Sequence, residues 1–536
     1  MVRAVRDRGL LRRWAAEVHP TSPTEGRRRR QGVETYGERV TTRSGDPAKS
    51  IPSRIPTGET SWVVLLSLVL ATTLANVASV CLFPHIVALS TEFGRPVNQV
   101  VWAIVGFHLI ATGVGGVAAA LGAVFGHRRM LITVLVLLFG GSLVVALSTN
   151  LAVLIVGRVI QGVGMATQAL AVGIIANYWK GESMRRALSM IVFAMALGAV
   201  IAYLGSGFIW RAGGDWRTLF WILAGAAAAD LVLTSIFVRE TRSRERVPID
   251  YVGCVGLVLW SVLLLLPLSQ ANSWGWGSAK VLGLLLPGIA AVLLWIWWEL
   301  RTRAPLIDLR VLKRAGVWQG AVVWPVITGS MCIPAAAYPY LLQTPVSSGF
   351  GFGRSLFIVS LALAVPAIMM TLLSGTATPI MRLVGPKRTM LLGLTMGLAG
   401  FGMAFAHGSI WLNLLWLALT GSLGAWAGSA SYAVAAEAVR PEQGIMVSAI
   451  YNTAGATGAA VAGAVAGFVL TLRTVAVDIE TPSGLVTEFF PAEETFTWSA
   501  LIVGGAAVVG ILCVLTIRSR QLHSPGQRDA APSRAS

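Results

Sequence analysis

The chain contains few charged side chains. Asp, Glu, Lys and Arg together make up 12% of its 536 residues, whereas 55% are hydrophobic. A soluble domain of this length must cover itself with polar side chains, and this composition cannot supply them. Lipid is therefore the expected solvent for most of the chain. Apolar runs of about 20 residues, the length that crosses a bilayer as a helix, recur along it, as in 62–86, 130–147 and 498–517.

Several chemical signatures are missing. The four cysteines, which lie inside apolar runs without paired ligand spacing, predict neither a disulfide framework nor a zinc site: Cys81, Cys254, Cys332 and Cys513. No Gly-x-x-x-x-Gly-Lys-Ser/Thr run occurs, so ATP hydrolysis is not expected. Because no nucleophile, base and oxyanion set can be assembled, we expect neither an enzyme nor a cofactor. The apolar runs lack strand-period alternation, which argues against a β-barrel.

No cleavable signal peptide precedes the first apolar run near Trp62, which would itself direct insertion. Residues 1–60 are rich in Arg, Pro, Ser and Gly and include the run Arg27–Arg30. Such a segment is typical of a disordered cytoplasmic tail. The alternative is that translation starts later.

The net charge is +18, which in a soluble protein would suggest a nucleic-acid partner. Here the cations lie between apolar runs, so we expect the lipid bilayer and no nucleic acid as partner. With the N-terminus inside, 13 of the Lys and Arg residues fall in the tail and 22 in the other cytoplasmic segments, against 6 outside and one, Arg158, within a helix. This asymmetry predicts a multi-pass protein of the cell membrane with both termini in the cytoplasm.

The sequence predicts an all-α membrane protein with fourteen transmembrane helices. Their ranges are 62–86, 99–124, 130–148, 151–178, 187–210, 217–238, 251–270, 281–299, 317–342, 354–380, 388–406, 409–437, 444–471 and 498–517. The predicted divisions are a tail over 1–60, a six-helix bundle over 61–238, a linker with helices 7 and 8 over 239–316, a second six-helix bundle over 317–517 and a tail over 518–536.

Two cytoplasmic loops have similar sequences. Phe125-Gly126-His127-Arg128-Arg129 follows helix 2, and Val384-Gly385-Pro386-Lys387-Arg388 follows helix 10. Because the loops are eight helices apart on one side, the halves are predicted to be parallel six-helix repeats with helices 7 and 8 inserted between them. The candidate residues of a conformational switch are Gly126, Arg128, Arg129, Gly385, Lys387 and Arg388.

Between about Trp62 and Arg518, several motifs follow one another in order. They are Gly157–Gly164, Asp215–Phe220, Ile249–Gly253, Leu268–Gln270 with Trp274–Trp276, Trp298–Arg301, Pro305–Arg310, Tyr338–Gln343 and Gly444–Ser448. Together these spaced motifs resemble the major facilitator superfamily, specifically its fourteen-helix drug:proton antiporter branch. The resemblance implies two six-helix bundles around a central cavity that opens alternately to each side. It also implies that returning protons drive export of hydrophobic, often cationic, small molecules. We expect a monomer.

The chain departs from this branch where proton coupling is concerned. In place of the usual Asp of helix 1 it has Ala75, with Asn76 beside it, and the loop motif has Ala123 and Arg382 where Asp is usual. The helix 5 antiporter motif is reduced to Gly198–Tyr203. These losses leave the implied fold intact and weaken the implied proton antiport.

Three ionisable residues inside predicted helices are candidates for proton coupling or cavity charge. Arg158 must face water or a partner, because a guanidinium in mid-bilayer costs several kcal/mol; the alternative is an arginine tied to helix carbonyls for architecture. Asp230 would be neutral in hydrocarbon, as a proton carrier requires, or simply hydrogen-bonded between helices. His108 titrates near neutral pH when unperturbed, or is a packing residue.

The expected substrate cavity is lined by helices 1, 4, 9 and 12 and parts of 2, 5, 10 and 13, as the resemblance implies. Gln161 and Gln168 extend the polar face of Arg158 at i+3 and i+10. The other candidates are Asn76, Trp102, Trp324, Tyr338, Tyr340, Gln343, Trp426, Tyr432, Tyr451 and Asn452. Aromatic faces with few charges suit bulky amphipathic solutes. The alternative is that many belong to the interfacial aromatic belt.

The predicted function is secondary active export of drug-like or secreted hydrophobic compounds by alternating access, driven by protons. One alternative is a facilitator or lipid-type exporter whose coupling uses no membrane carboxylate. Another, of a different class, is a transporter-like sensor or scaffold that carries nothing.

Overall fold

The computed structural model describes residues 59–240, 250–302, 305–307, 309–314, 316–405, 408–439, 444–481 and 484–517. Among these residues, thirteen helices are long and apolar enough to cross a membrane. The prediction of an all-α membrane fold with two bundles and an inserted helix pair is thereby confirmed. The predicted tails, 518–536 and all of 1–60 except Glu59 and Thr60, lie outside the described residues.

The first bundle contains six crossings, several of them interrupted. Its elements are α1 (Glu59–Val80), the 3₁₀ turn η1 (Phe83–His85), α2 (Ile86–Phe93), α3 (Val97–Val100), α4 (Trp102–Phe125), α5 (His127–Ala146), α6 (Leu151–Gly162), the 3₁₀ turn η2 (Val163–Met165), α7 (Ala166–Tyr178), α8 (Gly181–Arg211) and α9 (Trp216–Phe237).

The first crossing, predicted over 62–86, is found as a span from Trp62 to Phe93 that is broken near Pro84. Proline has no N–H, and its ring conflicts with the carbonyl four residues earlier. Helix α1 accordingly ends at Val80, and a single 3₁₀ turn follows in which the His85 amide donates to the Leu82 carbonyl at 3.0 Å. The break leaves carbonyl groups at the end of α1 in the interior of the protein.

The inserted pair consists of α10 (Tyr251–Trp274) and α11 (Ala279–Arg301), followed by the 3₁₀ helix η3 (Leu309–Lys313). The Asp250 carboxylate caps α10 by accepting from the Gly253 amide at 2.7 Å, and it also accepts from the Trp298 indole at 2.9 Å. One carboxylate thus joins the two helices at one end.

The second bundle contains α12 (Val317–Gln343), the 3₁₀ turn η4 (Val346–Ser348), α13 (Leu356–Val384), α14 (Pro386–Gly397), α15 (Ala399–Ala404), α16 (Ile410–Leu423), the π-helix η5 (Gly424–Gly428), α17 (Ser429–Ala438), α18 (Gly444–Thr471) and α19 (Glu493–Leu515). The predicted helix over 388–406 is divided into α14 and α15. At the division, the Leu398 amide donates to the Thr395 carbonyl at 3.2 Å, which is the spacing of a 3₁₀ turn. Each of the two helices is therefore shorter than a full membrane span.

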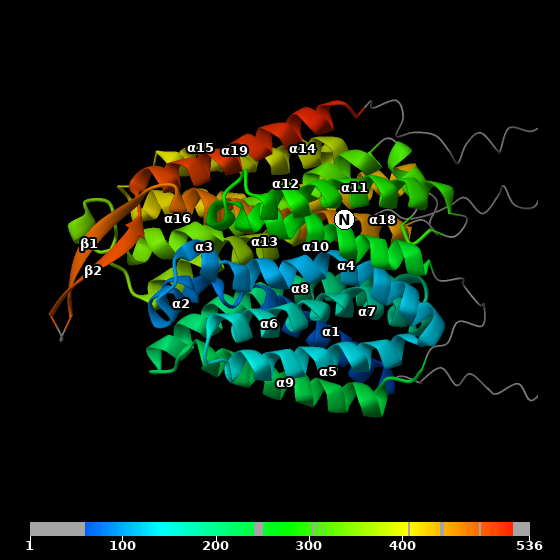
Figure 1. Cartoon of the computed structure of the whole chain (residues 1–536). Coiled ribbons are helices and arrows are strands. Elements are labelled where there is room, and N and C mark those ends of the chain that lie inside the picture. Colours follow the sequence, from blue (N-terminus) through cyan, green and yellow to red (C-terminus); the bar gives the residue numbers. More distant parts are fainter. Residues whose placement is uncertain are drawn as a thin grey trace, which may run out of the picture. The chain divides into compact units, whose positions relative to one another are not determined.

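A β-hairpin that the sequence analysis did not predict connects α18 to α19. Strands β1 (Thr474–Thr481) and β2 (Gly484–Pro491) pair antiparallel, with Thr474 opposite Pro491. Figure 1 shows the hairpin extending beyond the helix ends. We call this end of the helices the hairpin end, and the opposite end, which carries the loops at Gly126–Arg129 and Gly385–Arg388, the basic end.

The two bundles pack on each other at the hairpin end. Helix α8 lies along α13, α4 lies along α18, and η1 and α2 pack on α12. The rings of Phe208 and Phe357 are 5.7 Å apart, and the Arg211 guanidinium lies 5.2 Å from the centre of the Phe357 ring. The hairpin end is therefore closed by side chains from both bundles.

Adjacent glycines in α5 provide a matched test of the packing inside the first bundle. A Cβ on Gly141 would lie 2.9 Å from the backbone nitrogen of Gln161, whereas a Cβ on Gly140 would meet nothing within 4 Å. We expect Gly141→Ala to destabilise the protein by about 1–3 kcal/mol, as overpacking does. Gly140→Ala, which changes helix propensity by the same amount, should be neutral or stabilising. Thermal unfolding midpoints in detergent would measure both, and equal midpoints would contradict the close packing.

Candidate functional site

Arg158 lies on α6 with no exposed surface, and its guanidinium binds backbone carbonyls of two other helices. Its Nε donates to the Ala103 carbonyl of α4 at 2.9 Å, and its Nη1 donates to the Ala78 carbonyl of α1 at 2.6 Å. Nη2 reaches the Ser79 carbonyl at 3.5 Å, and the Phe107 ring centre lies 4.6 Å from the guanidinium carbon. One charge thus holds α1, α4 and α6 together.

The Ala78 and Ser79 carbonyls are available because α1 ends at Val80. The last four carbonyls of an α-helix have no partner within the helix, and the helix dipole makes this end partially negative. A guanidinium carries five N–H donors in a planar fork, which suits several carbonyls at once. The carbonyls that the helix break near Pro84 leaves without partners therefore accept from the buried guanidinium, and each satisfies the other.

A polar cluster extends from Arg158 in two directions. Towards α5, Nη1 also donates to Gln161 Oε1 at 2.9 Å, and Gln161 Nε2 donates to the Ser142 hydroxyl at 2.8 Å. Towards α4, His108 Nδ1 lies 3.0 Å from the Ile104 carbonyl and Nε2 lies 3.2 Å from the Ser79 hydroxyl. A carbonyl can only accept, so Nδ1 carries the proton and Nε2 accepts from Ser79 in the neutral ring.

The structure thus brings Arg158 and His108 to the same residue, Ser79, and leaves Asp230 elsewhere. Asp230 is fully buried between α9 and α1, where its Oδ1 accepts from the Ser67 hydroxyl at 3.0 Å. Ser67 also lies 2.7 Å from the Thr234 hydroxyl. Within the described residues Asp230 Oδ2 has no hydrogen-bond partner. The three candidate coupling residues fall in two separate polar clusters.

Among the predicted substrate residues, Trp324, Tyr432 and Tyr451 form an aromatic cluster in the second bundle. The Trp324 ring centre lies 5.5 Å from that of Tyr432 and 6.4 Å from that of Tyr451, and the two tyrosine rings are 5.2 Å apart. The Trp324 indole donates to the Ser431 hydroxyl at 3.1 Å. The cluster contains no charged side chain, so it offers ring faces rather than counter-ions.

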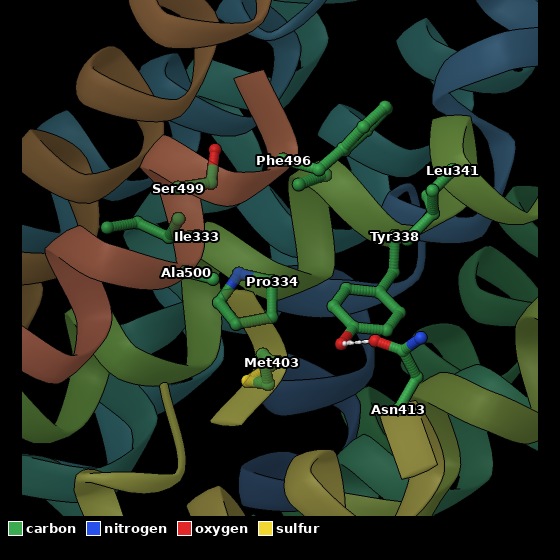
Figure 2. Close-up of a pocket in the computed structure, with 10 residues that line it drawn as sticks. Ile333, Pro334, Tyr338, Leu341, Met403, Asn413, Phe496, Ser499 and Ala500 are labelled. Atoms are coloured by element: carbon green, nitrogen blue, oxygen red, sulfur yellow. Dashed lines mark hydrogen bonds between the residues drawn. The ribbon is translucent and has the colours of Figure 1, made fainter. Parts of the chain in front are cut away.

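Tyr338 points towards α16 within the second bundle. Its hydroxyl donates to Asn413 Oδ1 at 2.8 Å, beside a cavity of about 20 Å³ that Phe496 and Ser499 of α19 also line (Figure 2). That volume is close to the size of one water molecule. In this conformation Tyr338 is part of the bundle interior and does not face a space that could hold a drug-sized solute.

The other predicted substrate residues are dispersed. The Asn76, Gln343 and Trp426 side chains donate to Thr72 O, Pro339 O and Thr376 Oγ1, respectively. Trp102 and Tyr340 are buried near the hairpin end, whereas Gln168 and Asn452 are half-buried on α7 and α18. Their contact with a substrate stays a prediction.

A cavity of about 520 Å³ lies between the inserted pair and the second bundle. It is lined from α10, α11, η3, α12, α18 and α19, and none of the predicted substrate residues lines it. Sequence reasoning missed it because the two tryptophans that form one wall, Trp260 and Trp295, lie in helices that the family resemblance places outside the central cavity.

The two similar loops make equivalent contacts in the two bundles. Gly126 and Gly385 have φ angles of +103° and +86°, which favour glycine. Arg128 Nη2 donates to the Ser235 carbonyl near the end of α9 at 2.6 Å, and Lys387 Nζ donates to the Leu515 carbonyl at the end of α19 at 3.3 Å. Each cation therefore binds the carbonyl end of the last helix of its own bundle.

Glu240 is a residue of this region that the sequence analysis missed. Its carboxylate accepts from the backbone amides of Arg128 and Arg129, both at 3.3 Å, and lies 3.6 Å from Arg129 Nε. It therefore caps the N-terminus of α5 from the segment after α9. A carboxylate at a helix N-terminus is stabilising, but the sequence signals no pairing between residues so far apart.

The sequence matches the Major Facilitator Superfamily over residues 68–378 and 328–535. It is 26% identical to "Uncharacterized MFS-type transporter YhcA" of Bacillus subtilis over 61% of this chain and 59% of that protein. It is 27% identical to "Multidrug resistance protein B homolog" of Mycobacterium tuberculosis over 68% of this chain and 66% of that protein. The chain thus spans less than two thirds of the length of either relative.

Solved structures share the fold at low identity. The human organic anion transporter MFSD10 (TETRAN) superposes with a TM-score of 0.56 and 15% identity, covering 85% of this chain and 100% of its own. The peptide transporter POT in complex with alafosfalin gives a TM-score of 0.61 and 13% identity, covering 85% and 94%. The chain belongs to the Major Facilitator Superfamily. It is a multi-pass membrane protein.

Neutralising Glu240 tests the cap on α5. We expect Glu240→Gln to lower stability by about 1 kcal/mol, because a neutral amide accepts more weakly from the two backbone amides and loses the attraction to the helix N-terminus. Thermal unfolding of this variant and of wild type in detergent is the measurement, and equal midpoints would contradict the capping role.

Proposed function

We propose that the protein exports hydrophobic or amphipathic drug-like or secreted compounds across the cell membrane by alternating access, in the manner of the fourteen-helix drug:proton antiporters. In this proposal the basic end faces the cytoplasm, as the cation asymmetry predicts. The names of relatives support the class of substrate. They include "Multidrug resistance protein B homolog" and, from Aspergillus fumigatus, "Major facilitator superfamily multidrug transporter mfsC", which is 24% identical over 58% of this chain and 59% of its own length.

The observation that carries the proposal is the position of the Arg158 cluster next to the contact between the bundles. Arg158 holds the end of α1, and the next elements along the chain, η1 and α2, pack on α12 of the second bundle. A change of charge in the cluster would therefore act on the elements that close the hairpin end. Alternating access requires such a link between a charged site and closure.

His108 is the proposed site at which a proton enters this link. Arg158 is the charged group beside it, and the Cys81 thiol lies near Arg158 at the end of α1. A proton on Nε2 would add a second positive charge next to Arg158 and would remove the acceptor for the Ser79 hydroxyl. Protonation should thus weaken the closed packing as the pH falls, and deprotonation should restore it.

Replacing Arg158 tests the cluster. Arg158→Lys keeps the charge but cannot reach carbonyls of α1 and α4 together, because an ammonium lacks the planar fork. We expect export of a fluorescent lipophilic cation to fall by about tenfold or more, since 1.4 kcal/mol of lost stabilisation changes an equilibrium tenfold. Arg186→Lys, in an exposed pair with Glu182 on α8, is the control. Uptake into everted vesicles measures export, and the proposal fails if Arg158→Ala transports as well as wild type.

A pair of substitutions separates the two polar clusters. His108→Gln keeps neutral hydrogen-bonding groups at all pH values, so we expect the export rate to lose the change on acidification that protonation of His108 produces. Asp230→Asn should retain the wild-type profile, because Asp230 lies outside the Arg158 cluster. Initial rates in proteoliposomes over a series of neutral to acidic pH values provide the measurement. The opposite pattern would assign the proton to Asp230 instead.

A facilitator that does not couple to protons is the second candidate, favoured by the missing Asp of helix 1 and by the place of Asp230 in a cluster that shares no hydrogen bond with Arg158 among the described residues. It predicts that adding substrate to everted vesicles never releases a preformed pH gradient. A sensor or scaffold would leave resistance to a broad compound panel unchanged in a host without its own efflux pumps.

A further inference from the structure

Helix α8 of the first bundle meets helix α13 of the second at Gly207, close to the hairpin end. A Cβ added to Gly207 would lie 2.9 Å from Ser360 Cβ and 3.3 Å from Phe357 Cδ2. Real Cβ atoms are not found so close to another atom, so a side chain at position 207 would force the two helices apart. Where α4 meets α18, a Cβ on Gly463 would meet only the end of a side chain, Val105 Cγ2, at 3.1 Å.

Two side chains that follow Gly207 on α8 reach across to the same ring of the second bundle. The Phe208 and Phe357 rings pack edge to face with their centres 5.7 Å apart, and the Arg211 guanidinium carbon lies 5.2 Å from the centre of the Phe357 ring. A guanidinium is attracted to the negative face of an aromatic ring. Among the described residues Arg211 forms no ion pair, so its attraction is directed to the other bundle. We call these three residues of α8, with Phe357 and Ser360 of α13, the α8–α13 seam.

Ser360 indicates that closing the seam has a cost. Its side chain has no exposed surface, and its hydroxyl has no hydrogen-bond partner among the described residues. A buried hydroxyl without a partner destabilises the conformation that buries it, and water would satisfy this hydroxyl if α8 moved away. The seam thus combines ring and cation contacts that favour closure with a polar group that favours opening. Such a balance suits a contact that forms and breaks.

We propose that the α8–α13 seam is the latch of the hairpin end. Gly207 lets the two bundles close, Phe357 and Arg211 hold them closed, and the seam parts when the hairpin end opens. These residues act on the equilibrium between two conformations and touch no substrate, so they are positioning residues. The proposal rests on the alternating access of the proposed function, which requires the bundles to separate at this end.

Two glycines of α8 provide a matched test of the latch. Gly207→Ala places a methyl group against Ser360 of the other bundle, whereas Gly205→Ala places one 4.0 Å from Leu219 Cδ2 within the first bundle. We expect Gly207→Ala to raise the ratio of open to closed protein about tenfold, because overpacking destabilises the closed contact. Gly205→Ala should leave the ratio unchanged. Ser360→Gly removes the opposing Cβ and should restore the ratio in the Gly207→Ala protein.

Electron spin resonance measures this ratio as a distribution of distances in nanodiscs. Spin labels are attached after Thr149→Cys in the first bundle and Ser347→Cys in the second, two exposed positions at the hairpin end, and the half-buried Cys513 is replaced by alanine. Equal ratios for the two glycine variants, or a Gly207→Ala shift that persists with Ser360→Gly, would overturn the latch. The measurement needs neither substrate nor a proton gradient, so the latch and the export proposal can fail separately.

Removing the cation tests the second contact of the latch. Arg211→Gln should raise the ratio of open to closed protein about 2–5-fold, the range that corresponds to an exposed contact between a cation and a ring. In a Phe357→Leu background the same change should have no further effect, because the ring that attracts the guanidinium is gone. Arg186→Gln, in an exposed pair at the other end of α8, is the control. An Arg211→Gln effect of equal size in both backgrounds would overturn the role of Arg211 in the latch.

Discussion

The arrangement of the first bundle depends on one electrostatic constraint, the burial of the Arg158 guanidinium where water cannot reach it. A buried charge without compensation destabilises a protein by several kcal/mol, and among the described contacts no carboxylate pairs with the Arg158 guanidinium. Carbonyl groups do so instead, from the end of α1 and from α4. For that to happen α1 must stop at Val80, and α6 must lie close to α5 through Gly141 so that Gln161 can turn towards the cation.

This constraint also joins the two halves of the molecule. The segment released by the break in α1 continues as η1 and α2, which pack on α12, so the cation fixes the direction in which the chain reaches the other bundle. Asp230 lies apart, in a small hydroxyl cluster of α1 and α9. The inserted helices take part in neither cluster, and they form instead one wall of the cavity of about 520 Å³.

Apolar runs predicted the helices well, because lipid requires every spanning backbone to satisfy its own hydrogen bonds. They also made Arg158 conspicuous as a charge within a helix. Its partners could not be predicted, because backbone carbonyls carry no sequence signal. Glu240 was missed for a similar reason, since its role arises from a contact between distant segments. Val475, Val477 and Ile479 alternate with other residues as in a strand. The hairpin was nevertheless not predicted, because the prediction rested on long lipid-facing apolar runs and the hairpin lies beyond the helix ends.

The equivalent contacts of Arg128 and Lys387 bear on how such a molecule can move. Each cation lies at the start of a helix and donates to the carbonyl end of the last helix in the same half, which is α9 for Arg128 and α19 for Lys387. Among the described contacts, these hydrogen bonds join neighbouring helices within a half and do not bridge the two halves. A movement of one half against the other would therefore leave both hydrogen bonds intact.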